Sequence, residues 1–249
     1  MLTAGIDIGS ITTEALLFDN EKGIRKYAIL QTGADSRKTA DAALDAVLLG
    51  QDLAVTDLKG IVATGCGRKR ALFTQQTVTE ITCIAKGVHY LFPDARIIID
   101  IGGQDTKAIK IDSKGRVTEF EMNDKCAAGT GRFIEVMAKA LDVELSKIGE
   151  LSLEHKKELT ISSICTVFAE SEVVSLVSEG EELQDILYGI HKAIAGRTMG
   201  LISRLGGIEG DVVMTGGVAK NTGVVKALES TLQKKINIYS EPQVVGALG

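Results

Sequence analysis

Two stretches of the chain have closely similar patterns of apolar and polar positions. The stretch GIDIGSITTEALLFD, from Gly5 to Asp19, is matched by IIDIGGQDTKAIKID, from Ile98 to Asp112, at an offset of 93 given by subtracting the residue numbers. Each is an apolar run that ends in Asp-x-Gly, a small polar turn and a second run in which apolar and polar residues alternate. This pattern predicts a β-hairpin, and its recurrence predicts a duplicated unit.

The remaining apolar positions predict a mixture of helices and strands. Apolar residues at helical spacing predict helices over residues 35–49, 79–91, 127–141, 166–178 and 183–205. Short apolar runs predict strands over 59–65 and 159–164, and another apolar run ends at a Thr-Gly-Gly turn, residues 215–217. A helical stretch follows this turn, and one more helix is expected at 246–249, beyond which we expect the natural chain to continue. The order of elements predicts an α/β fold with two domains, 1–95 and 96–249.

Composition and charge are typical of a globular protein. With 249 residues, 45% hydrophobic residues and 2 prolines, the chain is long enough for two domains of about 100 residues each. The net charge is −5 and the largest basic cluster is Arg68-Lys69-Arg70, so no nucleic-acid partner is expected. No apolar stretch approaches the roughly 18 residues that span a bilayer. We expect no secretory leader, because the first predicted strand begins at Leu2 without a basic n-region and cleavage site. We therefore expect no membrane partner, a cytoplasmic location and reduced cysteines.

The glycines of the two hairpins predict a phosphate site. Glycine lets backbone N–H groups approach an anion closely, and Gly9, Gly102 and Gly103 stand at the two turns. Each hairpin also has one carboxylate, Asp7 or Asp100, for a magnesium ion or its water ligands. Alternatively, the glycines only close tight turns; the repetition favours the phosphate interpretation.

A third glycine turn predicts an adenosine site. Gly216 and Gly217 follow the apolar run that begins at Asp211, and paired glycines let a flat nucleobase or ribose lie against the backbone. Asn221 is available for a hydrogen bond with the nucleoside. With these three turns, nearly the whole chain resembles the superfamily of sugar kinases, actin and heat-shock chaperone ATPases. The resemblance implies two duplicated actin/ribonuclease H-like domains with a nucleotide cleft between them.

The cysteines lack the spacing of a local metal site. None of the four forms a Cys-x-x-Cys pair, and each alone is typical of a buried small side chain. Cys126 and Cys165, however, each precede a predicted helix, whose N-terminus stabilises a thiolate and favours metal ligation. Two thiolates are half of a four-cysteine shell, so a twofold dimer would complete an iron–sulfur site on its axis. Inert core cysteines are the alternative, and we interpret Cys66 as structural and Cys83 as buried.

The sequence around Cys126 and Cys165 resembles a known family. The segments MNDKCAAGTGRF (122–133) and ISSICTVFAESE (161–172), with DIGGQD (100–105) and TGGV (215–218), closely resemble the activator components of 2-hydroxyacyl-CoA dehydratases, in the BadF/BadG/BcrA/BcrD ATPase family. The resemblance implies a homodimer with one 4Fe-4S cluster between its subunits. It also implies that ATP hydrolysis drives an electron from a ferredoxin or flavodoxin through the cluster to a dehydratase or related iron–sulfur acceptor.

The same resemblance implies roles for individual residues. Cys126 and Cys165 would bind the cluster, and Gln104 would position the attacking water, with Asp105 and Asp7 as further catalytic groups. The residues implied in binding ATP or ADP are Gly9, Ser10, Ile11, Thr12, Thr13, Gly102, Gly103, Gln104, Gly216, Gly217, Asn221 and Gln243. Many members have lysine where this chain has Glu14, so a lysine contact with phosphate is absent there. The alternatives are a small-molecule kinase of the same superfamily and a non-catalytic nucleotide switch with a bridging zinc.

Overall fold

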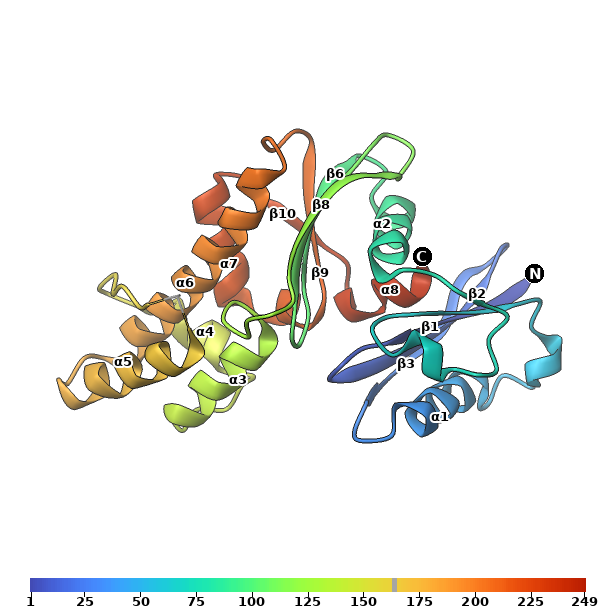
Figure 1. The fold of residues 1–249 in the computed structure, drawn as a ribbon, viewed down its shortest axis with the longest axis horizontal. Helices are drawn as coiled ribbons and strands as arrows, with labels where there is room; N and C mark the ends of the chain where they lie inside the picture. Colours follow the sequence, from blue (N-terminus) through green and yellow to red (C-terminus); the bar gives the residue numbers. More distant parts are fainter. Residues whose placement is uncertain (163–164) are drawn as a thin grey trace. The chain divides into compact units, whose positions relative to one another are not determined.

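The computed structural model describes residues 1–162 and 165–249, which form two compact units. The first unit comprises Met1–Ala95, Ile111–Thr118 and Tyr239–Gly249, and the second comprises Arg96–Lys110 and Glu119–Ile238. Each unit is built around one five-stranded sheet with helices packed on it (Figure 1). The chain is therefore an α/β protein with two domains, as the sequence predicted.

The sheet of the first unit has the order β3-β2-β1-β4-β5. Its strands are β1 (Leu2–Ile8), β2 (Thr12–Asp19), β3 (Gly23–Gln31), β4 (Ile61–Thr64) and β5 (Gln76–Thr77). β1 pairs antiparallel with β2 and parallel with β4, which confirms the first predicted hairpin. The helices and 3-10 turns of this unit are α1 (Ser36–Leu48), η1 (Val55–Asp57), η2 (Arg68–Arg70), α2 (Glu80–Leu91), η4 (Pro242–Val244) and α8 (Val245–Leu248).

The sheet of the second unit repeats this arrangement, with the order β10-β9-β6-β7-β8. Its strands are β6 (Ala95–Ile101), β7 (Thr106–Ile111), β8 (Val117–Asn123), β9 (Asp211–Thr215) and β10 (Ile236–Ile238). β6 and β7 form the second predicted hairpin. β9 lies beside β6, as β4 lies beside β1 in the first sheet. The duplication therefore extends from two short stretches to a whole sheet. The helical elements of this unit are α3 (Gly131–Ala140), α4 (Ile148–Ser152), α5 (Thr166–Ser178), α6 (Leu183–Arg204), η3 (Gly217–Lys220) and α7 (Thr222–Leu232).

In the first unit, alternate residues of β1 face opposite sides of the sheet. Ile6 and Ile8 belong to a buried cluster with the apolar residues of α1. On the other side lies α8, because a side chain at Gly5 would collide with the backbone of Ala247. Since side chains alternate along a strand, Asp7 lies on the side of the sheet that α8 covers.

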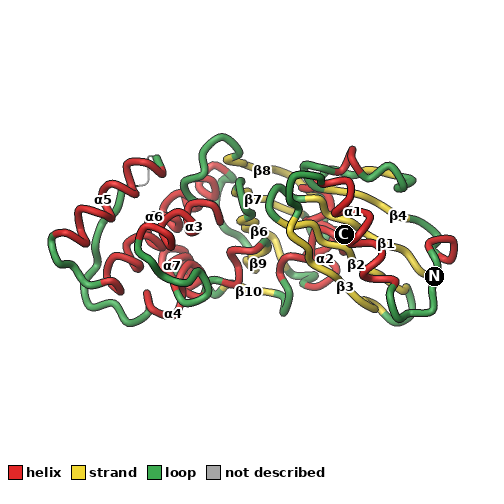
Figure 2. The backbone as a smooth tube through the Cα atoms, turned by 90° about the horizontal axis from the view of Figure 1, so that it is seen from below, coloured by secondary structure: helices red, strands yellow, loops and turns green. Residues whose placement is uncertain are grey.

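The second unit has the same alternation in β6. Ile97, Ile99 and Ile101 belong to one buried cluster with residues of α3, α4, α5, α6 and α7. Figure 2 shows these five helices together on one side of the strands β6 to β10. Asp100 therefore lies on the sheet face opposite this helical layer.

The predicted helices are confirmed to within one residue at each end for α1, α2, α5 and α6. The helix predicted over 127–141 begins only at Gly131. The preceding residues form a turn in which Gly129 has a φ of 94°, a backbone conformation that a right-handed helix does not contain. The prediction that Cys126 directly precedes a helix is therefore wrong.

The strand predicted over 159–164 is also wrong for the described residues 159–162, while residues 163 and 164 lie outside the described part of the chain. The apolar residues Leu159 and Ile161 pack instead beside α6, where a Cβ at Gly189 would lie 3.1 Å from both of them. A short apolar run can be buried against a helix as well as in a sheet, and periodicity alone does not separate the two cases.

The division into two units departs from the expected boundary between residues 95 and 96 in two segments of the chain. Ile111–Thr118 and the C-terminal Tyr239–Gly249 group with the first unit, although both follow residue 95 in the sequence. α8 packs against α2, where a side chain at Gly87 would collide with the backbone of Val245. Among the described residues, no helix has both the length and the apolar character that a bilayer crossing requires.

Candidate functional site

The two Asp-x-Gly hairpins end in turns with the same backbone closure. In the first turn (residues 9–12), the amide of the first residue donates to the carbonyl oxygen of the last at 3.0 Å. The second turn (residues 102–105) is closed by the equivalent bond, also at 3.0 Å. The middle residues of both turns are exposed or half-buried: Ser10, Ile11, Gly103 and Gln104. Turns of this kind can present backbone N–H groups to an anion.

A buried aspartate lies two residues before each turn. Asp7 is 9% exposed and Asp100 is 5% exposed, and each lies beside a glycine that follows the neighbouring strand. A side chain at Gly65 would collide with the Asp7 carboxylate, and a Cβ at Gly216 would lie 3.2 Å from Oδ1 of Asp100. Both glycines have a positive φ, 84° and 83°, which glycine adopts without strain. The Thr-Gly-Gly turn thus has a counterpart at residues 64–65, which the sequence interpretation missed.

Asp100 is held by two side chains of its own unit. The Thr215 hydroxyl donates to Oδ1 at 2.7 Å, and the Lys107 ammonium donates to Oδ2 at 3.1 Å. Lys107 is 1% exposed and also pairs with Oδ1 of Asp105 at 2.8 Å. The buried ammonium therefore neutralises Asp100 and joins it to the second turn.

Sequence reasoning missed Lys107, although a signal was present. Lys107 lies directly opposite Asp100 in the β6–β7 register, so both side chains lie on one face of the sheet. A lysine at a position that alternation assigns to the interior requires a buried carboxylate partner. Asp100 was the residue of the neighbouring strand able to supply it.

The first unit has the opposite charge at the position equivalent to Lys107. Glu14 lies opposite Asp7 in the β1–β2 register and is 5% exposed. Burial raises the pKa of Glu14 from 4.5 to about 7. The Gln243 amide donates to Oε1 of Glu14 at 3.4 Å and to the Thr12 hydroxyl at 3.3 Å. Gln243 therefore lies beside the first turn. The two hairpins have the same backbone arrangement, but they differ in the charge of the residue opposite the aspartate.

Two of the predicted nucleotide residues use their side chains within their own unit. Thr13 is fully buried, and its hydroxyl lies 2.9 Å from that of Thr32. Asn221 is the N-cap residue of α7, where its Oδ1 accepts from the amide of Val224 at 3.1 Å. Its Nδ2 lies 3.3 Å from Nε2 of His191.

His191 connects Asn221 to the short helix α4. Its imidazole is fully buried, and burial lowers its pKa to about 3, so the ring is neutral at neutral pH. Nδ1 lies 2.9 Å from Oγ of Ser152, whose own proton is donated to the carbonyl oxygen of Gly149 at 2.7 Å. Nδ1–H therefore donates to Ser152, and Nε2 accepts from Asn221. This network fixes the beginning of α7, which follows the Thr-Gly-Gly turn and η3.

The two candidate cluster ligands lie in different local structures. Cys165 is the N-cap residue of α5, as predicted, and its carbonyl oxygen accepts from the amide of Ala169 at 3.0 Å. Cys126 lies in the loop of residues 124–130, the Cys126 loop, which Asn123 anchors by donating to the Cys126 carbonyl oxygen at 3.0 Å. Both cysteines are free and half-buried.

The other two cysteines have different surroundings. Cys83 is 2% exposed, as predicted, and burial raises the pKa of its thiol. Cys66 is exposed, and its thiol donates to the carbonyl oxygen of Ile8 at 3.5 Å. Cys126 and Cys165 each offer a soft sulfur ligand on a partly exposed side chain. This donor set fits an iron–sulfur cluster whose other two ligands come from a second chain.

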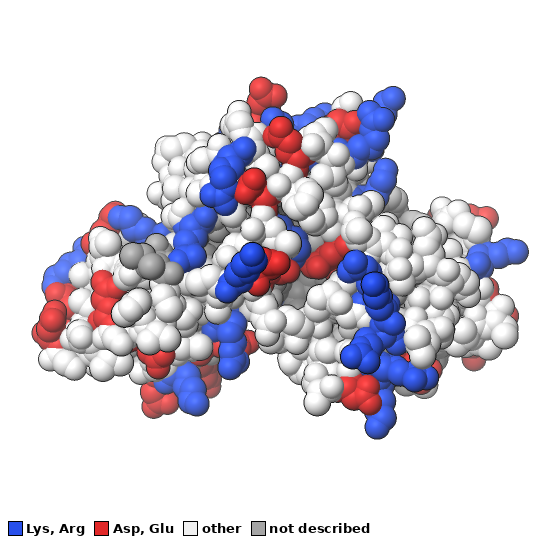
Figure 3. Space-filling model, in the orientation of Figure 1, with Lys and Arg blue, Asp and Glu red and all other residues white. Residues whose placement is uncertain are grey.

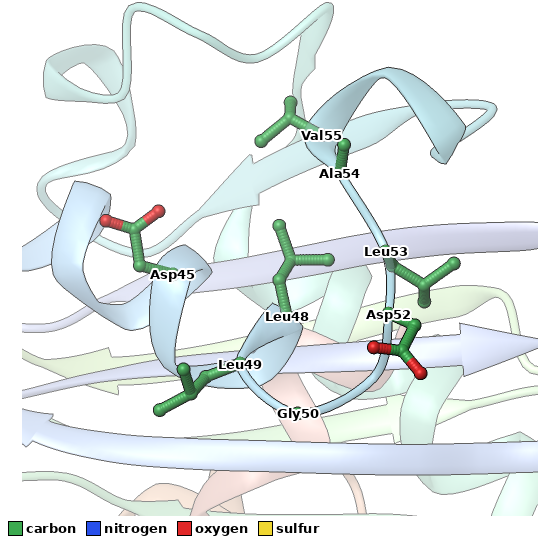
Figure 4. A pocket seen from close by; sticks show the side chains of 8 residues that line it. All are labelled: Asp45, Leu48, Leu49, Gly50, Asp52, Leu53, Ala54 and Val55. Atoms are coloured by element: carbon green, nitrogen blue, oxygen red, sulfur yellow. The ribbon is translucent and has the colours of Figure 1, made fainter.

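A surface hollow lies apart from these residues. Figure 4 shows it at the end of α1 and the loop that follows, with the lining residues Asp45, Leu48, Leu49, Gly50, Asp52, Leu53, Ala54 and Val55. The predicted site residues come from other loops of the chain. On the visible face, Figure 3 shows acidic and basic side chains interspersed.

A comparison with known protein families identifies the chain. The model of the BadF/BadG/BcrA/BcrD ATPase family matches residues 4–249. The chain belongs to this ATPase family. The family resemblance that the cysteine and glycine motifs carried is thereby confirmed.

Individual members of the family are similar over nearly their whole length. An activator of lactoyl-CoA dehydratase from Anaerotignum propionicum is 47% identical over 249 residues, which cover 100% of this chain and 95% of that protein. The activator of the 2-hydroxyisocaproyl-CoA dehydratase from Clostridium difficile, solved with bound ADPNP, is 42% identical with a TM-score of 0.94, covering 100% of this chain and 92% of that one. Component A of (R)-2-hydroxyglutaryl-CoA dehydratase from Acidaminococcus fermentans is 41% identical with a TM-score of 0.95, at coverages of 100% and 95%.

Proposed function

We propose that this protein is an ATP-hydrolysing iron–sulfur electron donor that passes a low-potential electron to a 2-hydroxyacyl-CoA dehydratase or a related cluster enzyme. The similarity to dehydratase activators over the whole chain supports this class of partner. The observation that carries the proposal is the combination, within the second unit, of a phosphate-type turn, a Thr-Gly-Gly turn and two free cysteines. An ATP-gated electron donor requires a nucleotide site and a metal site whose states are coupled through the protein.

Each turn is proposed to bind phosphate oxygens through the N–H groups of its middle residues. The ADPNP bound to the similar activator from Clostridium difficile supports a nucleotide as the ligand. Gly216 and Gly217 are proposed to contact the adenosine. Asn221 acts there indirectly, because its side chain already caps α7 and contacts His191.

Magnesium is proposed to bind with the phosphates, and its candidate carboxylates are Asp7 and Asp100, which precede the two turns. Both oxygens of Asp100 accept hydrogen bonds from the protein, so Asp100 acts on the ion through water. Asp7 is proposed as the second carboxylate of the magnesium site. Gln104, which is exposed in the second turn, orients the attacking water. The neighbouring Asp105 is proposed as a further catalytic group, and its carboxylate is held in place by the ion pair with Lys107.

Cys126 and Cys165 are proposed to bind a 4Fe-4S cluster shared with a second copy of the chain. When bound, the cluster supplies a one-electron carrier of low potential. The two cysteines hold one half of it, and the Cys126 loop and the start of α5 control how far it is exposed to water.

The exposed face of α5 supports the homodimer. Its residues Ala169 and Val173 are buried within the unit, whereas the apolar residues Val167, Phe168, Val174 and Val177 are between 51% and 65% exposed. Figure 1 shows α5 at the outer edge of the second unit. Because Cys165 begins this helix and requires thiolates from another chain, a second copy is the partner that fits this face. A ferredoxin or flavodoxin is proposed as the electron source.

The test is anaerobic purification, followed by iron and acid-labile sulfide analysis and an ATPase assay on the same preparation. We expect a brown protein with about four iron atoms per two chains, and hydrolysis that requires magnesium. Cys126→Ser and Cys165→Ser should each lose the cluster and keep nucleotide binding, because the cysteines and the turns are separate groups. Cys66→Ser, outside the ligand set, is the matched control and should keep its iron.

The alternatives give different results in the same experiment. A colourless protein that transfers phosphate to a small molecule would be a kinase, and bound zinc without hydrolysis would indicate a nucleotide switch. A normal cluster in either the Cys126→Ser or the Cys165→Ser protein would contradict the ligand assignment.

A further inference from the structure

The second turn is joined to α3 by direct backbone hydrogen bonds. The amides of Gly131 and Arg132, the first two residues of α3, donate to the carbonyl oxygens of Gly102 and Gly103, both at 2.9 Å. The first amides of a helix have no partner within the helix. Here the turn supplies the acceptors, so a displacement of the turn is transmitted to the start of α3.

Thr106 adds a side-chain bond to the middle of the Cys126 loop. Thr106 directly follows the second turn, is 3% exposed, and its hydroxyl donates to the carbonyl oxygen of Gly129 at 2.8 Å. Gly129 has a φ of 94°, and a Cβ there would lie 3.1 Å from Cδ of Arg197. The backbone conformation of the loop is therefore restricted at Gly129, three residues after Cys126.

The equivalent threonine of the first hairpin makes a different contact. Thr13 lies at the position of Thr106 in the duplicated pattern, and its hydroxyl bonds to Thr32, which in turn donates to the carbonyl oxygen of Gly9. Each hairpin thus uses a buried threonine to attach its turn to the next segment of its unit. In the second hairpin alone, that segment carries a candidate cluster ligand.

We propose that Thr106 is a positioning residue that couples the second turn to Cys126. This inference rests on the nucleotide role proposed for the turn above. A nucleotide that orders the turn also orders the Cys126 loop, because the loop is held by Thr106 at Gly129 and by Asn123 at Cys126. The consequence is that nucleotide binding lowers the accessibility of the Cys126 sulfur.

The experiment measures the alkylation rate of Cys126 in the full-length protein after removal of iron, with magnesium-ADPNP and without nucleotide. Peptide mass spectrometry separates Cys126 from the other cysteines, and ADPNP binding is measured on the same sample by calorimetry. We expect ADPNP to slow the labelling of Cys126. Thr106→Val should reduce this protection by about fivefold, the change that corresponds to the loss of one hydrogen bond.

Two variants separate coupling from a general loss of packing. Thr106→Ser retains the hydroxyl and should restore the protection seen in the wild-type chain. Thr198→Val removes another fully buried hydroxyl of the same unit, which donates to the carbonyl oxygen four residues earlier in α6. The Thr198→Val protein should keep the wild-type protection.

Each outcome supports or overturns the inference. If ADPNP binds but leaves the labelling of Cys126 unchanged, or if Thr106→Val is protected as well as the wild type, Thr106 does not couple the two sites. If ADPNP does not bind, the proposed function fails as well. Should Thr106→Val not fold, hydrogen exchange in the wild-type chain decides: ADPNP should slow exchange at the amides of Gly131 and Arg132, and unchanged exchange there would overturn the coupling.

Discussion

Replacing Lys107 by methionine should destabilise the second unit strongly. The Lys107 ammonium is 1% exposed and pairs with Asp100 at 3.1 Å and with Asp105 at 2.8 Å. Methionine fills similar space without charge, so two carboxylates are left without their counter-ion. Removing one partner of a buried ion pair costs about 3–5 kcal/mol. Because the Asp105 side chain is 28% exposed and can be solvated, the lower end, about 3 kcal/mol, is expected.

Thermal unfolding followed by circular dichroism measures this cost. A loss of about 3 kcal/mol lowers Tm by about 6–12 °C for a chain of this length. Lys110→Met is the matched control: Lys110 is half-buried on the same strand, and its ammonium donates to the Leu205 carbonyl oxygen at a longer 3.4 Å. We expect the control to change Tm by less than about 4 °C.

A double variant tests whether the unpaired charge is the cause. Asp100→Asn with Lys107→Met removes the charge of Asp100 and retains an oxygen for the Thr215 hydroxyl. The double variant should recover at least half of the Tm lost by Lys107→Met. A single variant that melts within about 2 °C of the wild type, or a double variant no more stable than the single one, would refute the interpretation of Lys107 as a buried counter-ion.

The remaining predictions concern Glu14, His191 and Asp7. Burial raises the pKa of Glu14 from 4.5 to about 7, so the buried carboxyl costs no stability below pH 4.5, and its cost grows as the pH rises to about 7. In urea unfolding at pH 8, the Glu14→Gln protein should therefore be more stable than the wild type by up to about 3 kcal/mol. Equal stability of the two proteins at pH 8 would contradict this prediction. The pKa of His191 is lowered from 6.5 to about 3, so between these pH values the unfolded chain binds a proton that the folded chain does not bind. Between pH 7 and pH 5, the free energy of unfolding of the wild type should therefore fall by about 2 kcal/mol more than that of His191→Gln. Equal losses in the two proteins would refute the assignment of a neutral imidazole. Asp7→Asn should lower ATP hydrolysis by about a hundredfold if its charge acts mainly in the transition state; unchanged turnover would return the first turn to a structural role.

The elements that the sequence predicted well are those specified by local periodicity. The two hairpins follow from alternation and an Asp-x-Gly ending, and α5 and α6 follow from the spacing of their apolar residues. Local spacing was misleading at residues 127–130, where Gly129 interrupts an otherwise helical pattern. The positive φ of Gly129 and the bond from Thr106 select a turn there, and the tertiary contact overrides the helical pattern.

The parts that the sequence did not predict depend on contacts between distant segments. α8 packs in the first unit because Gly5, Gly87 and Gly246 leave room for close backbone approach, which no local pattern encodes. The charge difference between the two hairpins was visible as Glu14 and Lys107. Its meaning required the strand register that places each residue opposite an aspartate.

The most direct test of the proposed function is electron transfer itself. The anaerobically purified protein is reduced with dithionite, freed of excess reductant, and mixed with a purified 2-hydroxyacyl-CoA dehydratase under magnesium-ATP, magnesium-ADPNP or no nucleotide. The absorbance of the oxidised cluster is followed over time. We predict that the protein loses its electron to the dehydratase only with hydrolysable ATP, and that Cys126→Ser and Cys165→Ser give no signal. Equal transfer without nucleotide, or steady ATP hydrolysis with no electron delivered, would contradict it.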